Sequence, residues 1–434
     1  MSHNEPAPTQ RLPTELLLLT LEHLHADPET LKQACLVSKL WLHISQPCLF
    51  NCVCLSAPTA DSPRTACAAL YEVLSGSPHI APFIRHITIL GGPVLAAPYP
   101  STIRWIPSDE TLPALLDVLA AACVQSLHIR LSNERWRDLT VPLKASLHAL
   151  VSSPTMHDVD LTGFDVVAAS LFSRCRTLKR LKLSETANGI LNAELVGGED
   201  TDPWPATCES LTVLDTVHAG DIISWVIRTP SFRTLRELRL GFHPLDDARH
   251  VEYVLRYVGD TLESLHLQPV YSRKSSYLWP DPADFIAIGG LFALTSLRLS
   301  LGLSLESNPL PWAAFLLGTA APARLQALTI DLRIGDARRD ARQSLLALPW
   351  AALDAALSAP HLAGLRALTL TCFEYTPPFL SAPPASSPAG NGILAWFLDE
   401  LPRLLPRSRA RSIFVAYELS EVQGVTILLL AGPD

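Results

Sequence analysis

One short apolar pattern returns along most of this chain and limits what the chain can fold into. The pattern is an apolar residue, two variable residues, an apolar residue, one variable residue and a last apolar residue, as in "LRELRL" (235–240). Its last two apolar positions alternate with a variable one, which predicts a β-strand with one buried face. The middle apolar residue of each copy is Ile87, Leu127, Val159, Leu181, Leu214, Leu238, Leu265, Leu297, Leu328, Leu368 or Ile413.

Segments with helical spacing of apolar residues lie between most of these copies. The copies recur every 22 to 45 residues, and "LFNCVCL" (49–55) is expected to contain the first strand. A strand and a helix in turn at this period indicate an α/β solenoid, in which each unit buries its apolar face only against its neighbours. The expected helices cover residues 108–122, 165–175, 220–229, 246–258, 312–321, 350–359 and 392–405.

The repeat resembles that of leucine-rich-repeat domains, and this resemblance implies a horseshoe over residues 51–434. The family's Asn or Cys after the third apolar residue is mostly absent, and the units are longer than the usual ~20–29 residues, so the expected horseshoe is irregular. The segment 376–391 is rich in Pro, Ser and Ala, which is typical of a disordered loop. Further insertions are expected at 91–107, 196–208 and 269–282.

Composition and charge exclude several classes of protein. Hydrophobic residues make up 48% of the 434 positions, whereas a net charge of −8 disfavours a nucleic-acid binder. The polar start "MSHNEPAPTQR" lacks the apolar core of a signal peptide, and no uncharged apolar run reaches the ~18 residues of a membrane helix. The nine cysteines include no C-x-x-C pair, so we expect reduced thiols in a cytoplasmic or nuclear protein.

The first fifty residues carry more apolar side chains than a small helical domain can cover. After residues 1–10, which are expected to be disordered, "LPTELLLLTLEHL" (12–24) predicts a helix whose four consecutive leucines face most directions around its axis. A second helix begins after Asp27, and a third carries Trp41 and ends at Pro47. Three short helices cannot bury this apolar set alone, so the rest of the chain or another protein must cover it.

This stretch resembles an F-box over residues 11–50. The F-box pattern consists of L-P-x-E-L-L, an apolar L-V-x-K-x-W segment and a later proline. In this chain Lys39 supplies the lysine of the second segment and Pro47 the later proline. F-boxes bind the small Skp-family adaptor of cullin–RING ubiquitin ligases, so the resemblance implies this adaptor, and through it a cullin, as partners. The adaptor-binding residues that it implies are Leu12, Pro13, Glu15, Leu16, Leu17, Leu21, Leu36, Val37 and Trp41.

Two positions depart from the F-box pattern. Thr20 stands where Ile or Val is usual, and Ser38 where Cys is common. Thr20 removes apolar area from the first helix, so a lower affinity for the adaptor is expected. The alternative interpretation makes these helices a cap for the solenoid, with their leucines satisfied internally. A three-helix DNA-binding motif is disfavoured, because a helix of "LLLL" offers no side chains that read bases.

In each predicted strand, the residue between the two buried positions points to the opposite, open face of the sheet. These positions form a mixed-charge stripe, in which arginines would be the best anchors for a protein partner, although any solvated sheet face carries such residues. Thr329 and Thr369 continue the stripe, and Asp158, Glu237 and Gln268 flank it. The candidate target-binding residues are His128, Arg130, Asp160, Arg180, Lys182, Asp215, Arg239, His266 and Arg298.

No common motif for catalysis or cofactor binding is present. There is no G-x-S-x-G, Walker loop, G-x-G-x-x-G or H-E-x-x-H, and "DVD" (158–160) lies within a strand pattern rather than a metal-ligand set. We therefore expect no enzymatic activity, no cofactor and no metal. The sequence predicts the substrate-recognition subunit of an SCF-type ubiquitin ligase, with an unidentified target protein. The alternative is a repeat scaffold that binds partners outside any ligase, with the first helices as its cap.

Overall fold

The structure is a computed structural model that divides into two compact units, Met1–Asp160 and Leu161–Asp434. Each unit contains parallel strands connected by helices, so the α/β class expected from the sequence is confirmed. The residues that the structure describes are 14–24, 27–57, 65–91, 105–134, 136–164, 166–172, 174–184, 190–191, 207–214, 219–244, 246–269, 287–303, 308–319, 324–335, 341–375, 396–397, 400–401, 403–410, 413–420 and 424–431. The predicted disordered segments 1–10 and 376–391 lie outside these ranges.

The first unit begins with three helices, here called the helical module. Asp27 caps the second by accepting a hydrogen bond from Thr30 N at 3.1 Å, and Ser38 caps the third by accepting one from Trp41 N at 3.3 Å. A cap of this kind satisfies an amide that the helix leaves unpaired, so these two side chains mark where the helices begin. The helices are α1 Thr14–His23, α2 Pro28–Val37 and α3 Lys39–Phe50.

The prediction that Pro47 ends the third helix is wrong, because α3 continues through it to Phe50. An internal proline removes one helical hydrogen bond and costs about 3 kcal/mol in an isolated helix. Here Cys48 and Leu49, just after the proline, pack against the core of the module. Burial of these side chains keeps the last turn helical.

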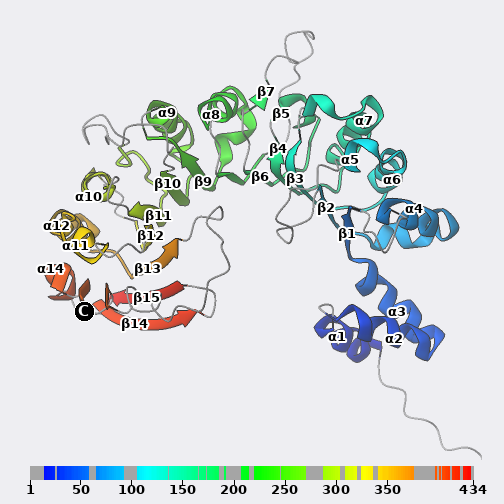
Figure 1. The fold of residues 1–434 in the computed structure, drawn as a ribbon, viewed down its shortest axis with the longest axis horizontal. Helices are drawn as coiled ribbons and strands as arrows, with labels where there is room; N and C mark the ends of the chain where they lie inside the picture. Colours follow the sequence, from blue (N-terminus) through cyan, green and yellow to red (C-terminus); the bar gives the residue numbers. More distant parts are fainter. Residues whose placement is uncertain are drawn as a thin grey trace, which may run out of the picture. The chain divides into compact units, whose positions relative to one another are not determined.

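Four parallel strands follow the helical module in the first unit, in the order β1-β2-β3-β4. They are β1 Cys52–Ser56, β2 His86–Leu90, β3 Ser126–Glu134 and β4 Asp158–Phe164, and the last four residues of β4 belong to the second unit. In Figure 1 the main connecting helices lie on one side of these strands. The connecting elements are α4 Ala66–Gly76, the 3-10 helix η1 Pro78–Phe83, α5 Trp105–Ser108, α6 Thr111–Ala120, the 3-10 helix η2 Trp136–Asp138 and α7 Val141–Val151.

Seven further parallel strands form the sheet of the second unit, in the order β6-β8-β9-β10-β11-β12-β13. They are β6 Arg180–Ser184, β8 Ser210–Leu214, β9 Glu237–Phe242, β10 Ser264–Pro269, β11 Ser296–Leu303, β12 Ala327–Gly335 and β13 Ala367–Tyr375. The helices that cross between them are α8 Ala219–Arg228, α9 Ala248–Val258, α10 Leu310–Thr319, α11 Ala341–Leu346 and α12 Trp350–Leu357, and the 3-10 helices are η3 Ala169–Phe172, η5 Pro230–Thr234 and η7 Pro360–Leu362. Thus five of the expected helices are present, and a sixth, 392–405, is described only in part.

Successive parallel strands are joined by one backbone carbonyl that accepts two hydrogen bonds, an arrangement called here the carbonyl ladder. Glu263 O, just after the first apolar position of its motif, accepts from Thr295 N at 2.9 Å and from Ser296 N at 3.0 Å. Because the backbone makes these bonds, the family's Asn or Cys is not needed to tie one unit to the next. The carbonyls that act in this way belong to Asn51, Arg85, Gln125, Lys179, Glu209, Arg236, Glu263, Thr295 and Gln326.

The predicted register of one repeat is wrong by three residues. Leu211, not Leu214, pairs with Leu181 on one side and Leu238 on the other. The buried Cys208 takes the first apolar position of this copy, so the motif begins three residues earlier than predicted. Thr212 consequently holds the outward position that was assigned to Asp215, and Asp215 itself lies outside the described residues.

Two other predictions are wrong. Residues 165–175 do not form an α-helix but a two-residue strand, β5 Val167–Ala168, and η3; β5 pairs with β7 Ile190–Leu191. This unit spans only 22 residues between its markers, the shortest interval of the repeat, and a 3-10 helix takes the place of the longer α-helix. The copy at Ile413 is not a further parallel strand: β14 Ile413–Ser420 pairs antiparallel with β15 Gly424–Ala431, since three residues between them permit only a hairpin.

A glycine at the start of α8 allows two crossing helices to approach closely. Gly220 N donates to Asp247 Oδ1 at 2.9 Å, while His243 N donates to Asp247 Oδ2 at 2.8 Å. A Cβ added at Gly220 would lie 3.0 Å from His250 Nδ1 and 3.1 Å from Asp247 Oδ1. The glycine therefore leaves room for a buried carboxylate that ties the start of α8 to the segment before α9.

We expect Gly220→Ala to lower the free energy of unfolding by about 1–3 kcal/mol, because the new methyl group must displace buried polar atoms. Gly318→Ala is the matched control, since Gly318 also lies in a helix and nothing stands within 4 Å of an added Cβ. That substitution should raise the free energy of unfolding by about 0.5–1 kcal/mol. Urea unfolding of both variants measures the difference, and equal effects would contradict the close approach at Gly220.

Candidate functional site

The helical module exposes a set of large apolar side chains, called here the apolar surface. Leu36 and Val37 at the end of α2 are 80% and 68% exposed, and Leu40 follows at the start of α3. Six of the eleven exposed large apolar side chains that the described part of the chain contains belong to this module. Its members are Leu16, Leu19, Leu36, Val37, Leu40 and Leu42.

The predicted adaptor-binding residues divide into an exposed set and a buried set. Leu16, Leu36 and Val37 are exposed, whereas Leu17 and Leu21 are buried in the module's own core with Leu31, Ala34 and Ile44. Trp41 is half-buried against this core, and Glu15 lies in α1. Leu12 and Pro13 lie outside the described residues. Leu17 and Leu21 therefore hold the helices together, and only the exposed set is available to a partner.

The two departures from the F-box pattern have local structural roles. Thr20 Oγ1 donates to Leu16 O at 2.8 Å, one turn earlier in α1, so its hydroxyl is satisfied within the helix. Ser38 is the only residue between α2 and α3, and its side chain caps α3. Both polar side chains are exposed, so neither interrupts the buried core of the module.

The open face of the second unit's sheet carries a row of residues in register. Lys182, Thr212 and Arg239 are paired on β6, β8 and β9, and Arg239, His266 and Arg298 on β9, β10 and β11. Thr329 and Thr369 continue the row on β12 and β13, as the sequence predicted. The apolar residues on either side of each outward residue are buried, so the alternation expected from the sequence is confirmed for these strands except β8, where Thr212 is buried as well.

The first unit places two predicted residues side by side. His128 Nδ1 lies 3.7 Å from Asp160 Oδ2, and His128 Nε2 makes a hydrogen bond of 2.8 Å with Ser126 Oγ. Arg130, two residues along β3, is exposed. In the second unit Arg180 is exposed and lies on β6, two residues before Lys182.

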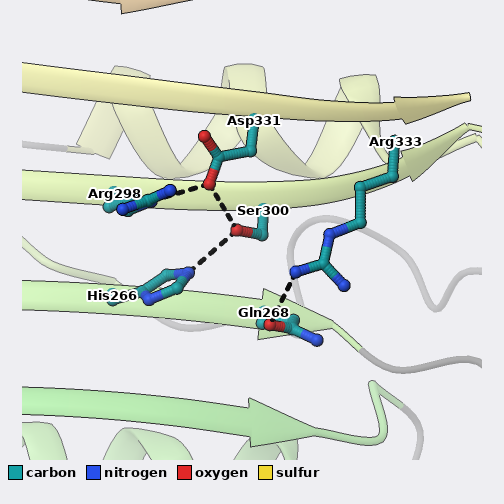
Figure 2. Close-up of polar contacts among 6 residues, drawn as sticks. All are labelled: His266, Gln268, Arg298, Ser300, Asp331 and Arg333. Atoms are coloured by element: carbon teal, nitrogen blue, oxygen red, sulfur yellow. Dashed lines mark hydrogen bonds and ion pairs between the residues drawn. The ribbon is translucent and has the colours of Figure 1, made fainter. Parts of the chain in front are cut away.

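Side chains of β10, β11 and β12 form a hydrogen-bonded polar cluster (Figure 2). Asp331 Oδ2 accepts from Arg298 Nε at 2.7 Å and from Ser300 Oγ at 2.8 Å. Ser300 Oγ is also 2.8 Å from His266 Nε2. On the other side of Ser300, Arg333 Nη2 donates to Gln268 Oε1 at 3.3 Å. Ser300, Asp331 and Gln268 are buried and form the floor of the cluster, whereas Arg298 is exposed and Arg333 is half-buried.

The hydrogen bonds of this cluster fix which atom of His266 carries the proton. Ser300 gives its single hydroxyl proton to Asp331, so His266 Nε2 must be the donor to Ser300 Oγ. Burial, together with the neighbouring charge of Arg298, lowers the pKa of His266 to about 4. His266 is therefore neutral near pH 7, with a lone pair on Nδ1.

The order of these groups differs from that of a serine-hydrolase triad. A nucleophilic serine gives its proton to the histidine, whereas Ser300 stands between His266 and Asp331 and gives its proton to the carboxylate. The cluster therefore provides no activated nucleophile. Its arrangement suits binding, because a buried carboxylate orients an arginine on an open surface.

Sequence reasoning identified His266, Gln268 and Arg298 but missed Ser300, Asp331 and Arg333. The repeat motif ends at its third apolar residue, while the alternation of buried and outward residues continues through β11 and β12. Leu332 is buried after Leu328 and Ile330. Following this alternation beyond the motif would have placed the three missed residues on the open face.

The described residues offer no metal site and no membrane-spanning helix, and the searches for related proteins find no match. Among the described residues, no three His, Cys, Asp or Glu side chains are placed to hold a metal ion. No helix in the described ranges is both long and apolar enough to cross a membrane. Cys52 and Cys54 are exposed, free thiols on β1. No protein-family model matches this chain, and a search of curated proteins finds no match.

The depressed pKa of His266 should make stability depend on pH. The unfolded state binds a proton near pH 6.5 and the folded state only near pH 4, so stability is full above about pH 6.5 and falls as the pH is lowered through this window. We expect the chain to lose about 1–2 kcal/mol from this group between pH 7 and pH 5. His266→Gln, which still can donate to Ser300, should reduce that loss. Urea unfolding at the two pH values measures it, and an unchanged loss in the variant would contradict the assignment.

Proposed function

We propose that this chain is the substrate-recognition subunit of an SCF-type cullin–RING ubiquitin ligase. The helical module docks a Skp-family adaptor and through it a cullin, and an irregular leucine-rich-repeat-like solenoid binds a target protein. The chain then holds its target near a ubiquitin-charged enzyme in the cytoplasm or nucleus and acts by proximity rather than by chemistry of its own.

The apolar surface of the helical module is the observation that carries this proposal. Burying apolar area is favourable by about 25 cal/mol per Å², so exposed side chains such as Leu36 and Val37 indicate a surface that another protein covers. The sequence-based resemblance to an F-box names the kind of protein. Two features of the module support the proposal: it has a small buried core of its own, and it leaves other apolar side chains exposed outside that core.

The polar face of the strands supports the second half of the proposal. Lys182, Arg239, His266 and Arg298 lie in one register row on β6, β9, β10 and β11, with Thr212 of β8 between the first two. Short strands that present one side chain each in a row give a partner an ordered set of contacts without changing the buried core. Arginine is well suited to this role, because its planar group donates several hydrogen bonds in a fixed geometry.

The decisive test substitutes exposed residues only, because Leu17→Asp would unfold the module. Leu16→Asp with Leu36→Asp should reduce capture of a purified Skp-family adaptor at least tenfold, since each change puts a charge into an apolar contact. Leu346→Asp is the matched control: Leu346 is 46% exposed and Leu16 48%, but Leu346 lies on α11. Adaptor capture that survives the double substitution would exclude the apolar surface as the docking site.

The alternative, a scaffold capped by its first helices, is favoured by one contact. In the first unit α3 packs against η1, so removing the helices would uncover part of the first repeat. If the module is only a cap, a chain of residues 51–434 should aggregate, and the full chain should not bind the adaptor. If it is a docking module, the full chain binds the adaptor whatever the shortened chain does. Size-exclusion chromatography and adaptor capture together separate the two.

A further inference from the structure

We propose that the arginines above the polar cluster form a recognition site for an extended protein segment rich in aspartate or glutamate. The site consists of Arg239 on β9, Arg298 on β11 and Arg333 on β12. This inference rests on the part of the proposed function that assigns the strands to target recognition, and it does not involve the adaptor.

Arg298 is oriented from below by a buried carboxylate. Its Nε donates to Asp331 Oδ2, and the Asp331 side chain is 2% exposed while that of Arg298 is 47% exposed. Among the described residues Arg298 makes no other hydrogen bond, so its two terminal nitrogens remain available on the open face. An arginine held by one edge loses less conformational freedom when the other edge binds a carboxylate.

The two flanking arginines are not neutralised. Arg239 is exposed and has no hydrogen bond or ion pair with any described residue, and Arg333 donates only to the neutral side chain of Gln268. His266, between Arg239 and Arg298, stays neutral near pH 7. Among the described residues, the carboxylates on this part of the face are those of Asp331 and of Glu237, two residues before Arg239. Three guanidinium groups against two carboxylates leave a positive surface that an anion can bind.

The spacing of the arginines favours separate carboxylates over a single phosphate. Neighbouring strands lie about 4.8 Å apart, and each residue advances about 3.3 Å along a strand. Arg333 is three strands from Arg239 and four residues beyond its register row, so their Cα atoms are roughly 20 Å apart. A phosphate dianion is bound best by several cations that converge on it. Cations that are spread over four strands instead match single negative charges that are spaced along an extended chain.

The test measures binding of the full chain to fluorescein-labelled decapeptides by fluorescence anisotropy. The probe alternates Glu with Ser; one comparison peptide replaces each Glu by Gln, and another carries phosphoserine in that Gln peptide. The Glu peptide should bind at least tenfold more tightly than the Gln peptide at low salt, and the difference should shrink as salt is raised. Binding of the phosphoserine peptide alone would overturn the proposal.

Two substitutions with the same charge change locate the site. Arg239→Gln should weaken binding of the Glu peptide about tenfold, the usual effect of removing a hydrogen-bonded charge. Arg249→Gln is the control, because Arg249 is also exposed and unbonded within the described residues but lies on α9, among the connecting helices. It should change affinity less than twofold. Equal losses would show that net charge alone is responsible and would overturn the site.

Neither arginine has a hydrogen bond or ion pair with another described residue, so both variants should remain folded, and circular dichroism checks this. The measurement contains no adaptor. Loss of adaptor capture with intact binding of the Glu peptide would therefore contradict the docking assignment and leave the recognition site standing. Adaptor capture with no preference for the Glu peptide would contradict the recognition site and leave the docking assignment standing.

Discussion

The carbonyl ladder is the interaction on which the rest of this structure depends. One carbonyl per unit, such as Arg236 O, accepts two amide hydrogens from the next strand and sets the register of the parallel pair. Parallel strands can slip by two residues without exposing their apolar side chains, so a fixed starting point is needed for every pair. Since the ladder is made of backbone, the sequence at these positions is free to vary from unit to unit.

Threonine hydroxyls strengthen the same junctions in several units. Thr155 Oγ1 donates to Val124 O at 2.7 Å, and Thr261 Oγ1 donates to Leu235 O at 2.9 Å. These bonds take the place that an asparagine ladder holds in the family that the repeat resembles. They also explain how units of very different length stack together: the junction involves only a few residues before each strand, and the segments beyond it can lengthen without disturbing it.

The apolar pattern predicted most strands because burial of alternating side chains leaves a strong signal in the sequence. It failed where the pattern can be placed in two ways. In "CESLTVLDT" (208–216) both Leu211 and Leu214 can serve as the middle position of the motif, and only the pairing with β6 and β9 decides between them. The polar cluster was predicted only in part because the motif is shorter than the strands. His266 and Arg298 lie inside the motif, but Asp331 lies beyond it and can be placed only when the length of β12 is known.

The two candidate surfaces differ in how favourably water hydrates them when no partner is bound. Leu36 and Val37 on the apolar surface are unfavourable in water at all times, so a protein that covers them should remain bound. Arg239 is exposed and hydrated when no partner is bound. The net binding free energy is therefore only the difference between its interaction with a partner carboxylate and its interaction with water, which favours weak binding and exchange of partners. A chain built in this way would keep one constant subunit on its helical module and release successive partners from its strands. That division of labour is what a substrate receptor requires and what a simple scaffold does not.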